Sequence, residues 1–519
     1  MQGKIFFALI VSVLLAGLAA RLLSRLYRRR IVKLMSGGAA PAENLLASYA
    51  LPAGTDQTEP RQFMESSLCA NRASRRRLAF VLIVLSLLMG ISVAWFLLMF
   101  VYHEGGFGPV KLLIMGAIYA APIVPVLGML WRWSWMRVVA AACGYLSFCV
   151  LIVALRSTEQ QSYSGVVMWL AGQIGLPLAA VLILTGSGKA RAAAPYLFLP
   201  FLVLTTASIL GLDALEGSME SEYSGAIAAL AGWFGAHLTF ILFAVVPWII
   251  AFWPVRSLSR WLAMRYRKQA FSEVTYLFGG YWLLSLLFYA LPPFRVLGFG
   301  TFGVLSAWLW IPIGFRIARP LLVRQGPAPV LLVLRVFRRD AEVEELFDRT
   351  IERWRASGSA VLIAGSDLVS RTMNPDDLFA FIQGSLATRF VRDEETLRQQ
   401  LASIETRPDH DGRYRVSDFY CFDTTWQAVL VALVGRADRV LMDLRGLTAQ
   451  NRGCLFELET LANAKHIKRI VLLNDSVTDR ATAESALGTG NDVADRIIWE
   501  DVKQMTSAKA EKMLGYLLT

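Results

Sequence analysis

Long apolar runs dominate the first 320 residues, and they constrain the fold more than any other feature. A membrane-spanning helix needs about 20 predominantly apolar residues. We count nine runs of about that length, at residues 5–22, 78–101, 110–130, 138–155, 166–184, 196–212, 226–252, 276–291 and 299–317. The 519 residues are 55% hydrophobic and 18% charged, which is too apolar for a soluble chain of this length. The sequence therefore predicts a polytopic α-helical membrane domain over residues 1–320, with the lipid bilayer as its partner.

Charge is divided unevenly between the two parts of the chain. Residues 1–320 contain 26 basic and 11 acidic residues, whereas residues 321–519 contain 26 basic and 29 acidic residues. Because the basic excess lies entirely in the apolar part, it fits the positive-inside rule and not a nucleic-acid footprint. We expect no nucleic-acid partner.

Basic residues gather in alternate connections between the apolar runs. They lie in the loop 27–77 and around residues 132–137, 189–191 and 256–268, whereas the connection 212–223 is acidic. This alternation predicts a multi-pass inner (plasma) membrane protein with its N-terminus outside and the region after Arg319 in the cytoplasm. Residues 254–271 combine arginines with aromatic residues, so we expect an interfacial helix there.

Two polar residues, His237 and Gln173, interrupt the expected spans. Such residues mark ion paths in some membrane proteins, and in others they only bond a neighbouring helix. The segment YSGVVMWLAGQIGLPL from Tyr163 also resembles YSGAIAALAGWFGAHL from Tyr223. A duplicated helix hairpin and a chance similarity of apolar sequence both remain open.

After residue 327 the pattern changes to short apolar runs that alternate with charged helical segments, which is typical of an α/β fold with a parallel sheet. We expect strands at residues 329–337, 360–365, 439–444, 468–475 and 496–499. The region 327–519 is therefore predicted to be one flavodoxin-like α/β domain. An insertion at about residues 368–422 separates its second strand from the next helix.

Polar side chains follow the third expected strand. Asp443 ends that strand, Arg445 follows, Asn451 precedes the next helix, and Glu457 lies one turn inside it. Ligands of open parallel sheets bind beyond the carboxyl ends of the strands, so these four residues are our candidate site. The plainer interpretation is a strand-end cap at Asp443 and a solvated helix residue at Glu457. The four histidines and five cysteines lack metal-ligand spacing, so we expect neither a metal nor a cofactor.

The order of these segments resembles Toll/interleukin-1 receptor (TIR) domains and their relatives, the nucleoside deoxyribosyltransferases. The TIR-like features are Asp340 after the first strand and the C-x-x-E-L of residues 454–458, where Gly453 stands in place of a common tryptophan. The deoxyribosyltransferase-like features are Asp443, Leu444, Asn451, Glu457 and Leu458.

The resemblance implies chemistry at an N-glycosidic bond. Glu457 would be the catalytic carboxylate that stabilises or traps an oxocarbenium-like centre. Asp443 and Asn451 would bind ribose hydroxyls, and Arg445 would bind a phosphate. NAD would then be a substrate and not a cofactor.

Three functions follow from these features. We expect a membrane-anchored, TIR-like signalling or defence protein that acts through a cytoplasmic interaction or nucleotide-binding domain and self-associates through that domain. The first alternative is an enzyme that cleaves the N-glycosidic bond of NAD(P) or a nucleoside with Glu457. The second is a transporter with a regulatory cytoplasmic domain.

Overall fold

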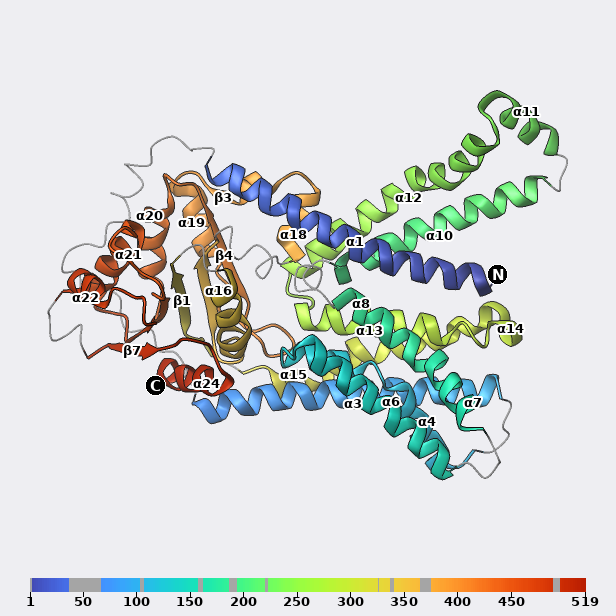
Figure 1. Ribbon diagram of the computed structural model, residues 1–519, viewed down its shortest axis with the longest axis horizontal. Helices are drawn as coiled ribbons and strands as arrows, with labels where there is room; N and C mark the ends of the chain where they lie inside the picture. The colour runs from blue at the N-terminus through green and yellow to red at the C-terminus, as the bar shows by residue number, and fades with distance from the viewer. Residues whose placement is uncertain are drawn as a thin grey trace. The chain divides into compact units, whose positions relative to one another are not determined.

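The computed structural model divides into two compact units (Figure 1). It describes residues 2–36, 67–102, 107–156, 162–185, 194–219, 223–324, 326–336, 340–364, 375–488 and 495–519. The membrane unit comprises Met1–Ser24 and Ala79–Arg316, and the α/β unit comprises Arg25–Leu78 and Ile317–Thr519. The basic residues expected at 189–191 lie outside the described residues.

Helices make up the membrane unit. They are α1 (Gln2–Met35), α3 (Leu68–Phe100), α4 (Pro109–Tyr119), α5 (Ile123–Leu130), α6 (Trp135–Arg156), α7 (Tyr163–Leu170), η1 (Ala171–Gly175), α8 (Leu176–Thr185), α10 (Ala194–Met219), α11 (Ser224–Phe234), α12 (Ala236–Arg267), α13 (Glu273–Tyr289), α14 (Phe294–Leu297), η2 (Gly298–Leu309) and α15 (Trp310–Leu322). Seven helices among the described residues are long and apolar enough to cross a membrane: α1, α3, α6, α10, α12, and the continuous stretches α7–α8 and α14–α15. The chain is therefore a multi-pass membrane protein.

Two of the nine expected runs differ from simple spans. The run at 110–130 forms the pair α4 and α5, which are bent by 51° relative to each other. The run at 276–291 forms α13, which has 17 residues and is buried along most of its length. The count of nine spans is thus not confirmed by helix length and composition.

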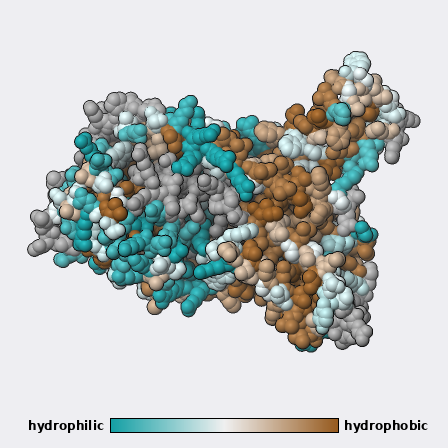
Figure 2. Space-filling model, in the orientation of Figure 1, coloured by the Kyte–Doolittle hydropathy of each residue, from teal (hydrophilic) through white to brown (hydrophobic). Residues whose placement is uncertain are grey.

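The surface of the membrane unit is apolar. Large hydrophobic side chains such as Met136 and Trp233 are 80% and 87% exposed, and Figure 2 shows hydrophobic residues across this unit. Among the described residues after Leu322, by contrast, the exposed large hydrophobic residues are Ile382 and Val477. An extended apolar surface of this kind needs a lipid environment.

Residues 254–267 do not form a helix of their own. They continue α12, which contains Pro247 and Pro254 in its interior. A proline ends most helices in water, but membrane helices tolerate it because neighbouring groups satisfy the freed carbonyl. The expected span at 226–252 is instead broken at Gly235, whose φ of +81° separates α11 from α12.

The α/β unit contains a seven-stranded, fully parallel sheet. The strands are β1 (Val330–Arg335), β2 (Ser359–Ile363), β3 (Phe390–Val391), β4 (Val416–Cys421), β5 (Arg439–Asp443), β6 (Arg469–Asn474) and β7 (Ile497–Asp501). The helices are α16 (Asp340–Leu346), η3 (Phe347–Ile351), α17 (Glu352–Trp354), α18 (Pro375–Ile382), η4 (Leu386–Arg389), α19 (Glu394–Ala402), α20 (Trp426–Val434), α21 (Arg452–Asn463), α22 (Arg480–Leu487) and α24 (Ser507–Leu518). The expected parallel sheet is therefore present.

The strand order is β3-β4-β2-β1-β5-β6-β7. Without the two-residue β3, the six longer strands follow the doubly wound order 3-2-1-4-5-6, whereas a flavodoxin-like sheet has the order 2-1-3-4-5. The flavodoxin-like fold is thus not confirmed. The difference arises from residues 416–421, which we expected inside an insertion but which form β4 and pair with β2. Of the expected insertion, residues 375–421 belong to the crossover that leads to this strand, and residues 368–374 lie outside the described residues.

Two apolar layers cover the sheet. One face packs against α19, α20, α21 and α22 through residues such as Leu397, Val429 and Leu458. The other face packs against α16, η3, α17 and α24 through residues such as Leu346 and Leu514. Helices on both faces explain why β1 and β5 are buried at every residue, as expected for parallel strands.

Two helices belong to both units. Residues 25–35 of α1 and residues 68–78 of α3 fall in the α/β unit, and neither helix is interrupted where the unit changes. With 34 and 33 residues, each helix is about 50 Å long, which exceeds the hydrocarbon thickness of about 30 Å. The excess length extends into the α/β unit.

Candidate functional site

The carboxyl ends of β1 and β5 meet at the point where the strand order reverses. The chain moves from β1 to β2 and β4 on one side and returns to β5 on the other side. Arg335, the last residue of β1, lies in register with Asp443, the last residue of β5. In doubly wound sheets the ligand crevice lies outside this switch point, so the architecture places a candidate site here.

Asp443 and Arg445 form a buried ion pair with each other. The Arg445 side chain donates from Nε to Oδ1 of Asp443 at 2.9 Å and from Nη2 to Oδ2 at 2.6 Å. Its Nη2 also donates to the carbonyl oxygen of Glu342 in α16. Both charged residues are almost fully buried. Asp443 is therefore occupied by a neighbour two residues away, and not presented as a free carboxylate.

Asn451 stabilises the turn between β5 and α21. Its Oδ1 accepts hydrogen bonds from the backbone N–H and the hydroxyl of Thr448, at 2.8 and 2.9 Å. The side chain thus holds the loop that leads into α21.

Glu457 is the predicted site residue whose environment is most unusual. It is 4% exposed, and among the described residues its Oε2 has no hydrogen-bond partner. Burial raises the pKa of Glu457 to about 8, and the positive charge of Arg335 offsets a part of that rise. A carboxyl group with such a pKa is largely protonated at neutral pH and can donate a hydrogen bond or a proton.

Asp443 and Glu457 lie on opposite faces of the sheet. Side chains alternate along a strand, so Asp443 shares the face of Leu441, which packs against α16 and α24. Glu457 belongs to α21, whose Leu458 packs into the other face. Asp443 thus pairs with Arg445 and Asn451 with Thr448, whereas Glu457 lies on a helix of the other face. Their role in N-glycosidic chemistry stays a prediction.

A buried hydrogen-bond network connects α1 with the sheet. The hydroxyl groups of Tyr27 and Tyr420 are 2.7 Å apart, and the Tyr420 hydroxyl donates to Oδ2 of Asp377 at 2.9 Å. Arg389 donates from Nη2 to Oδ1 of the same carboxylate at 2.9 Å. The Tyr27 ring also meets Phe381 edge-on. The network thus joins α1, β4, α18 and η4 within the α/β unit.

An acidic residue of β4 lies close to this network. Asp418 is two residues before Tyr420, so both side chains share one face of the sheet. Burial, reinforced by the charge of Asp377, raises the pKa of Asp418 well above its usual range. Two buried carboxyl groups close together favour protonation of one of them.

Buried polar contacts also hold the first turn of α3. Asn71 is fully buried, and its Nδ2 donates to the carbonyl oxygen of Arg353 at 2.9 Å and to the hydroxyl of Ser357 at 2.7 Å. Arg72 pairs with Glu511 of α24, and Glu511 also pairs with Arg353. The helix end is thereby fixed to the α16–α24 side of the sheet.

Sequence reasoning missed the residues of these helix contacts. The alternation in V-S-D-F-Y-C offered a signal, because the polar residues Asp418 and Tyr420 alternate with the apolar residues Phe419 and Cys421. Tyr27 and Asn71 lie within basic segments that read as solvated helix ends. Their partners are more than 280 residues away, so no local pattern could reveal them.

No family model, curated protein or solved structure matches this chain. Among the described residues, no group of three or more His, Cys, Asp or Glu side chains could hold a metal ion.

Proposed function

We propose that the protein is a multi-pass membrane signalling protein in which the α/β unit binds a nucleotide-type ligand and transmits its state to the membrane helices. The observation that carries this proposal is the attachment of two membrane helices to the α/β unit. Both α1 and α3 continue without a break into that unit and end in buried polar contacts. A domain that only needed an anchor could hang from a single flexible linker.

The positions of the two attachments support transmission. Tyr27 bonds to Tyr420 of β4 near the carboxyl end of that strand, at the edge of the sheet where ligands bind in such folds. Asn71 bonds to the segment between α17 and β2. A ligand that shifts the loops at the carboxyl edge would therefore move groups to which a membrane helix is bound. Such a shift needs different ligand affinities in the two states.

The carboxyl edge supports a ligand of nucleotide type without a dinucleotide fingerprint. Arg335 and Glu457 lie at this edge, and doubly wound sheets bind nucleotides there. The stretch V-F-R-R-D that follows β1 contains no glycine, whereas the dinucleotide motif needs glycines at that turn. We therefore favour recognition of the ligand by side chains, and not by a glycine-rich loop.

We place the α/β unit in the cytoplasm, as the basic loops predict. The Lys4 side chain pairs with Asp213 and Glu216 near the end of α10, so the N-terminus and this acidic segment share one end of the membrane unit. The positive-inside rule puts both of them outside, and that agreement supports the orientation.

We infer seven or nine spans from the connectivity of the helices. The start of α3 and the end of α15 both lie in the α/β unit. The number of crossings from α3 through α15, with both helices counted, must therefore be even. The helices α3, α6, α7–α8, α10, α12 and α15 give an even number. The bent pair α4–α5 and the helix α13 must therefore both cross the bilayer or both remain on one side.

The two alternative functions lack comparable support. Cleavage of NAD would need Glu457 together with residues that hold the ribose, but Asp443 and Asn451 are engaged elsewhere. For transport, His237 would have to line the interior of the bundle. It lies instead in the exposed first turn of α12, because Gly235 ends the preceding helix.

Hydrogen exchange of the full-length protein in phosphatidylcholine nanodiscs tests the proposal. We expect NAD or ATP at millimolar concentration to slow exchange around residues 443–457 and to change exchange at residues 25–33. In Tyr420→Phe the first effect should remain and the second should weaken. Protection of the sheet edge without any change in α1 would contradict transmission, and no protection by either nucleotide would contradict the proposed ligand class. Release of nicotinamide that Glu457→Gln abolishes would restore the enzyme hypothesis.

A further inference from the structure

Hydrogen bonds from neighbouring helices stabilise the break between α4 and α5. Pro122 precedes α5 and cannot donate a backbone hydrogen bond, so carbonyl groups at the end of α4 need other partners. The Tyr145 hydroxyl of α6 donates to the carbonyl oxygen of Ala117. The Tyr289 hydroxyl of α13 donates to the carbonyl oxygen of Tyr119 at 3.1 Å. Carbonyl groups at the break thus accept hydrogen bonds from two other helices. A break inside a bilayer is stable only when its backbone polar groups have such partners.

Close packing of α3 fixes the pair in place. A Cβ atom on Gly90 would lie 2.2 Å from the carbonyl oxygen of Gly116, and one on Gly116 would lie 2.5 Å from the Ile91 side chain. The two helices therefore touch through their backbones. Small residues at such a contact are the usual means of close helix association in membranes.

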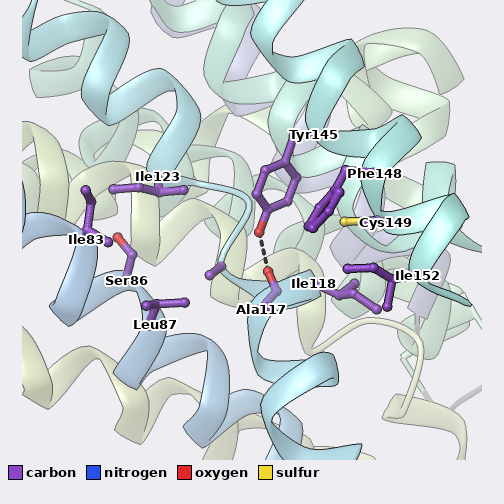
Figure 3. A pocket seen from close by; sticks show the side chains of 11 residues that line it. Ile83, Ser86, Leu87, Ala117, Ile118, Ile123, Tyr145, Phe148, Cys149 and Ile152 are labelled. Carbon is purple, nitrogen blue, oxygen red and sulfur yellow. Dashed lines mark hydrogen bonds between the residues drawn. The ribbon is translucent and has the colours of Figure 1, made fainter. Parts of the chain in front are cut away.

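A cavity of about 150 Å³ lies beside this break. Residues of α3 and α6 line two of its sides, and Figure 3 shows the Tyr145 hydroxyl directed at the Ala117 carbonyl among the apolar side chains of the cavity. The lining residues at its outer edge, Leu87 and Phe148, are 40% and 57% exposed on helices that qualify as membrane spans. The cavity therefore adjoins the apolar surface of the membrane unit.

One polar group in this apolar cavity has no partner. Ser86 is fully buried, and its hydroxyl makes no hydrogen bond to any of the described residues. Ser92 on the same helix donates to the carbonyl oxygen of Leu88 at 2.9 Å, which is how a helical serine satisfies itself without a ligand. A buried hydroxyl without a partner is unfavourable, so Ser86 indicates a group that the structure does not contain.

We propose that this cavity binds a small lipophilic alcohol or ketone from the bilayer, with the ligand oxygen bonded to Ser86. A dry cavity of about 150 Å³ holds a molecule of the size of benzene, which limits the buried part of the ligand to about six heavy atoms. The serine hydroxyl both donates and accepts, so it matches either oxygen group. This inference goes beyond the proposed signalling function and does not depend on it.

Photolabelling of the full-length protein in phosphatidylcholine nanodiscs with a diazirine-bearing octanol tests the site. We expect labelling within α3 and α6 that 1-hexanol suppresses. Ser86→Ala should weaken the competition by 1-hexanol by about fivefold, the value of one hydrogen bond, and leave competition by hexane unchanged. Ser92→Ala is the control on the same helix, because the Ser92 hydroxyl already has partners in Leu88 and Trp310, and it should change neither.

Filling the cavity gives an independent outcome. Ile152→Trp should remove the labelling, whereas Leu113→Trp, on an exposed side chain of α4, should retain it. If Ile152→Trp does not fold, Ile152→Phe provides a smaller filling change with the same expected direction. Labelling that is equal in the filled and control variants, or competition that Ser86→Ala leaves unchanged, would overturn the proposal.

Discussion

The hydroxyl groups of Tyr27 and Tyr420 lie 2.7 Å apart, although the two residues are separated by 393 positions in the chain. One belongs to a helix that begins in the membrane unit, and the other belongs to the parallel sheet. Both side chains are buried, and Asp377 and Arg389 extend the contact. A buried network of this kind is stable only when each member is satisfied. The end of α1 is therefore part of the core of the α/β unit.

The contact of Asn71 should stabilise the α/β unit. Replacement by alanine leaves the Ser357 hydroxyl and the Arg353 carbonyl with one partner fewer in a buried place, at a cost of about 1–3 kcal/mol. Hydrogen exchange of the slowest amides of β1 and β2 in the full-length protein measures this loss. Arg72→Ala, in the exposed neighbouring residue, should cost less than about 1 kcal/mol. Equal effects of the two variants would contradict a buried anchor at Asn71.

Glu457 should make the α/β unit less stable as the pH rises. Its pKa rises from 4.5 to about 8 on folding because of burial, so the folded state binds the proton more tightly than the unfolded state. The resulting stability is fully present below pH 4.5 and is lost as the pH rises through about 8, at up to about 1.4 kcal/mol per pH unit. Glu457→Gln should remove this slope.

Glu459→Gln is the matched control for this prediction, because Glu459 is exposed on the same helix. Burial also raises the pKa of Asp409 to about 6 and that of Asp418 well above its usual range, so both add slopes of the same sign, and Glu457→Gln should remove only the part that Glu457 contributes. The comparison is therefore sharpest between about pH 6 and pH 8, above the pKa of Asp409 and below that of Glu457. A wild-type protein whose stability is constant over that interval would show that Glu457 is not held protonated.

The ion pair of Asp443 and Arg445 should behave as a structural element. Asp443→Ala leaves a buried guanidinium without its partner and should cost about 3–5 kcal/mol. The exposed pair of Arg480 and Glu484 provides the control, since Glu484→Ala should cost less than about 1 kcal/mol. Hydrogen exchange of β5 measures both changes. If Asp443→Ala weakens nucleotide binding and leaves stability unchanged, the residue is a ligand-binding group after all.

Sequence patterns predicted the two parts of the chain and most strands, because long apolar runs and short buried strands are local signals. The strand order could not be predicted in the same way. Residues 416–418 are half-buried and residues 419–421 are buried, and the place of this strand beside β2 depends on pairing across more than 50 residues. The flavodoxin-like order was expected because this strand was assigned to an insertion.

The candidate site was predicted only in part. Burial of Glu457 follows from its helix packing on the sheet, but the face that each acid occupies depends on strand register. Asp443 was expected beside Glu457, and the alternation of β5 directs it to the other face. The partners of Tyr27 and Asn71 required the three-dimensional arrangement, since charged helix ends next to a membrane normally lie in solvent.

An even number of crossings predicts the side of the bilayer on which four positions of the membrane unit lie relative to one another. Single cysteines in place of Gly108 and Ser134 flank the pair α4–α5, and cysteines in place of Lys268 and Arg295 flank α13. In a variant without the five native cysteines, a membrane-impermeant thiol reagent should label both pairs from opposite sides or both pairs from one side. Labelling from opposite sides in one pair and from the same side in the other would contradict the even number of crossings.

The most direct test of the attachment of α1 to the α/β unit is a double-mutant cycle between Tyr27→Phe and Tyr420→Phe. Stability of β4 in the full-length protein, measured by hydrogen exchange, gives the four free energies of the cycle. Because the two hydroxyl groups share one bond within a buried network, we expect an interaction energy of about 0.5–3 kcal/mol. Additive effects, within about 0.3 kcal/mol, would show that α1 is not coupled to the sheet and would contradict transmission through it.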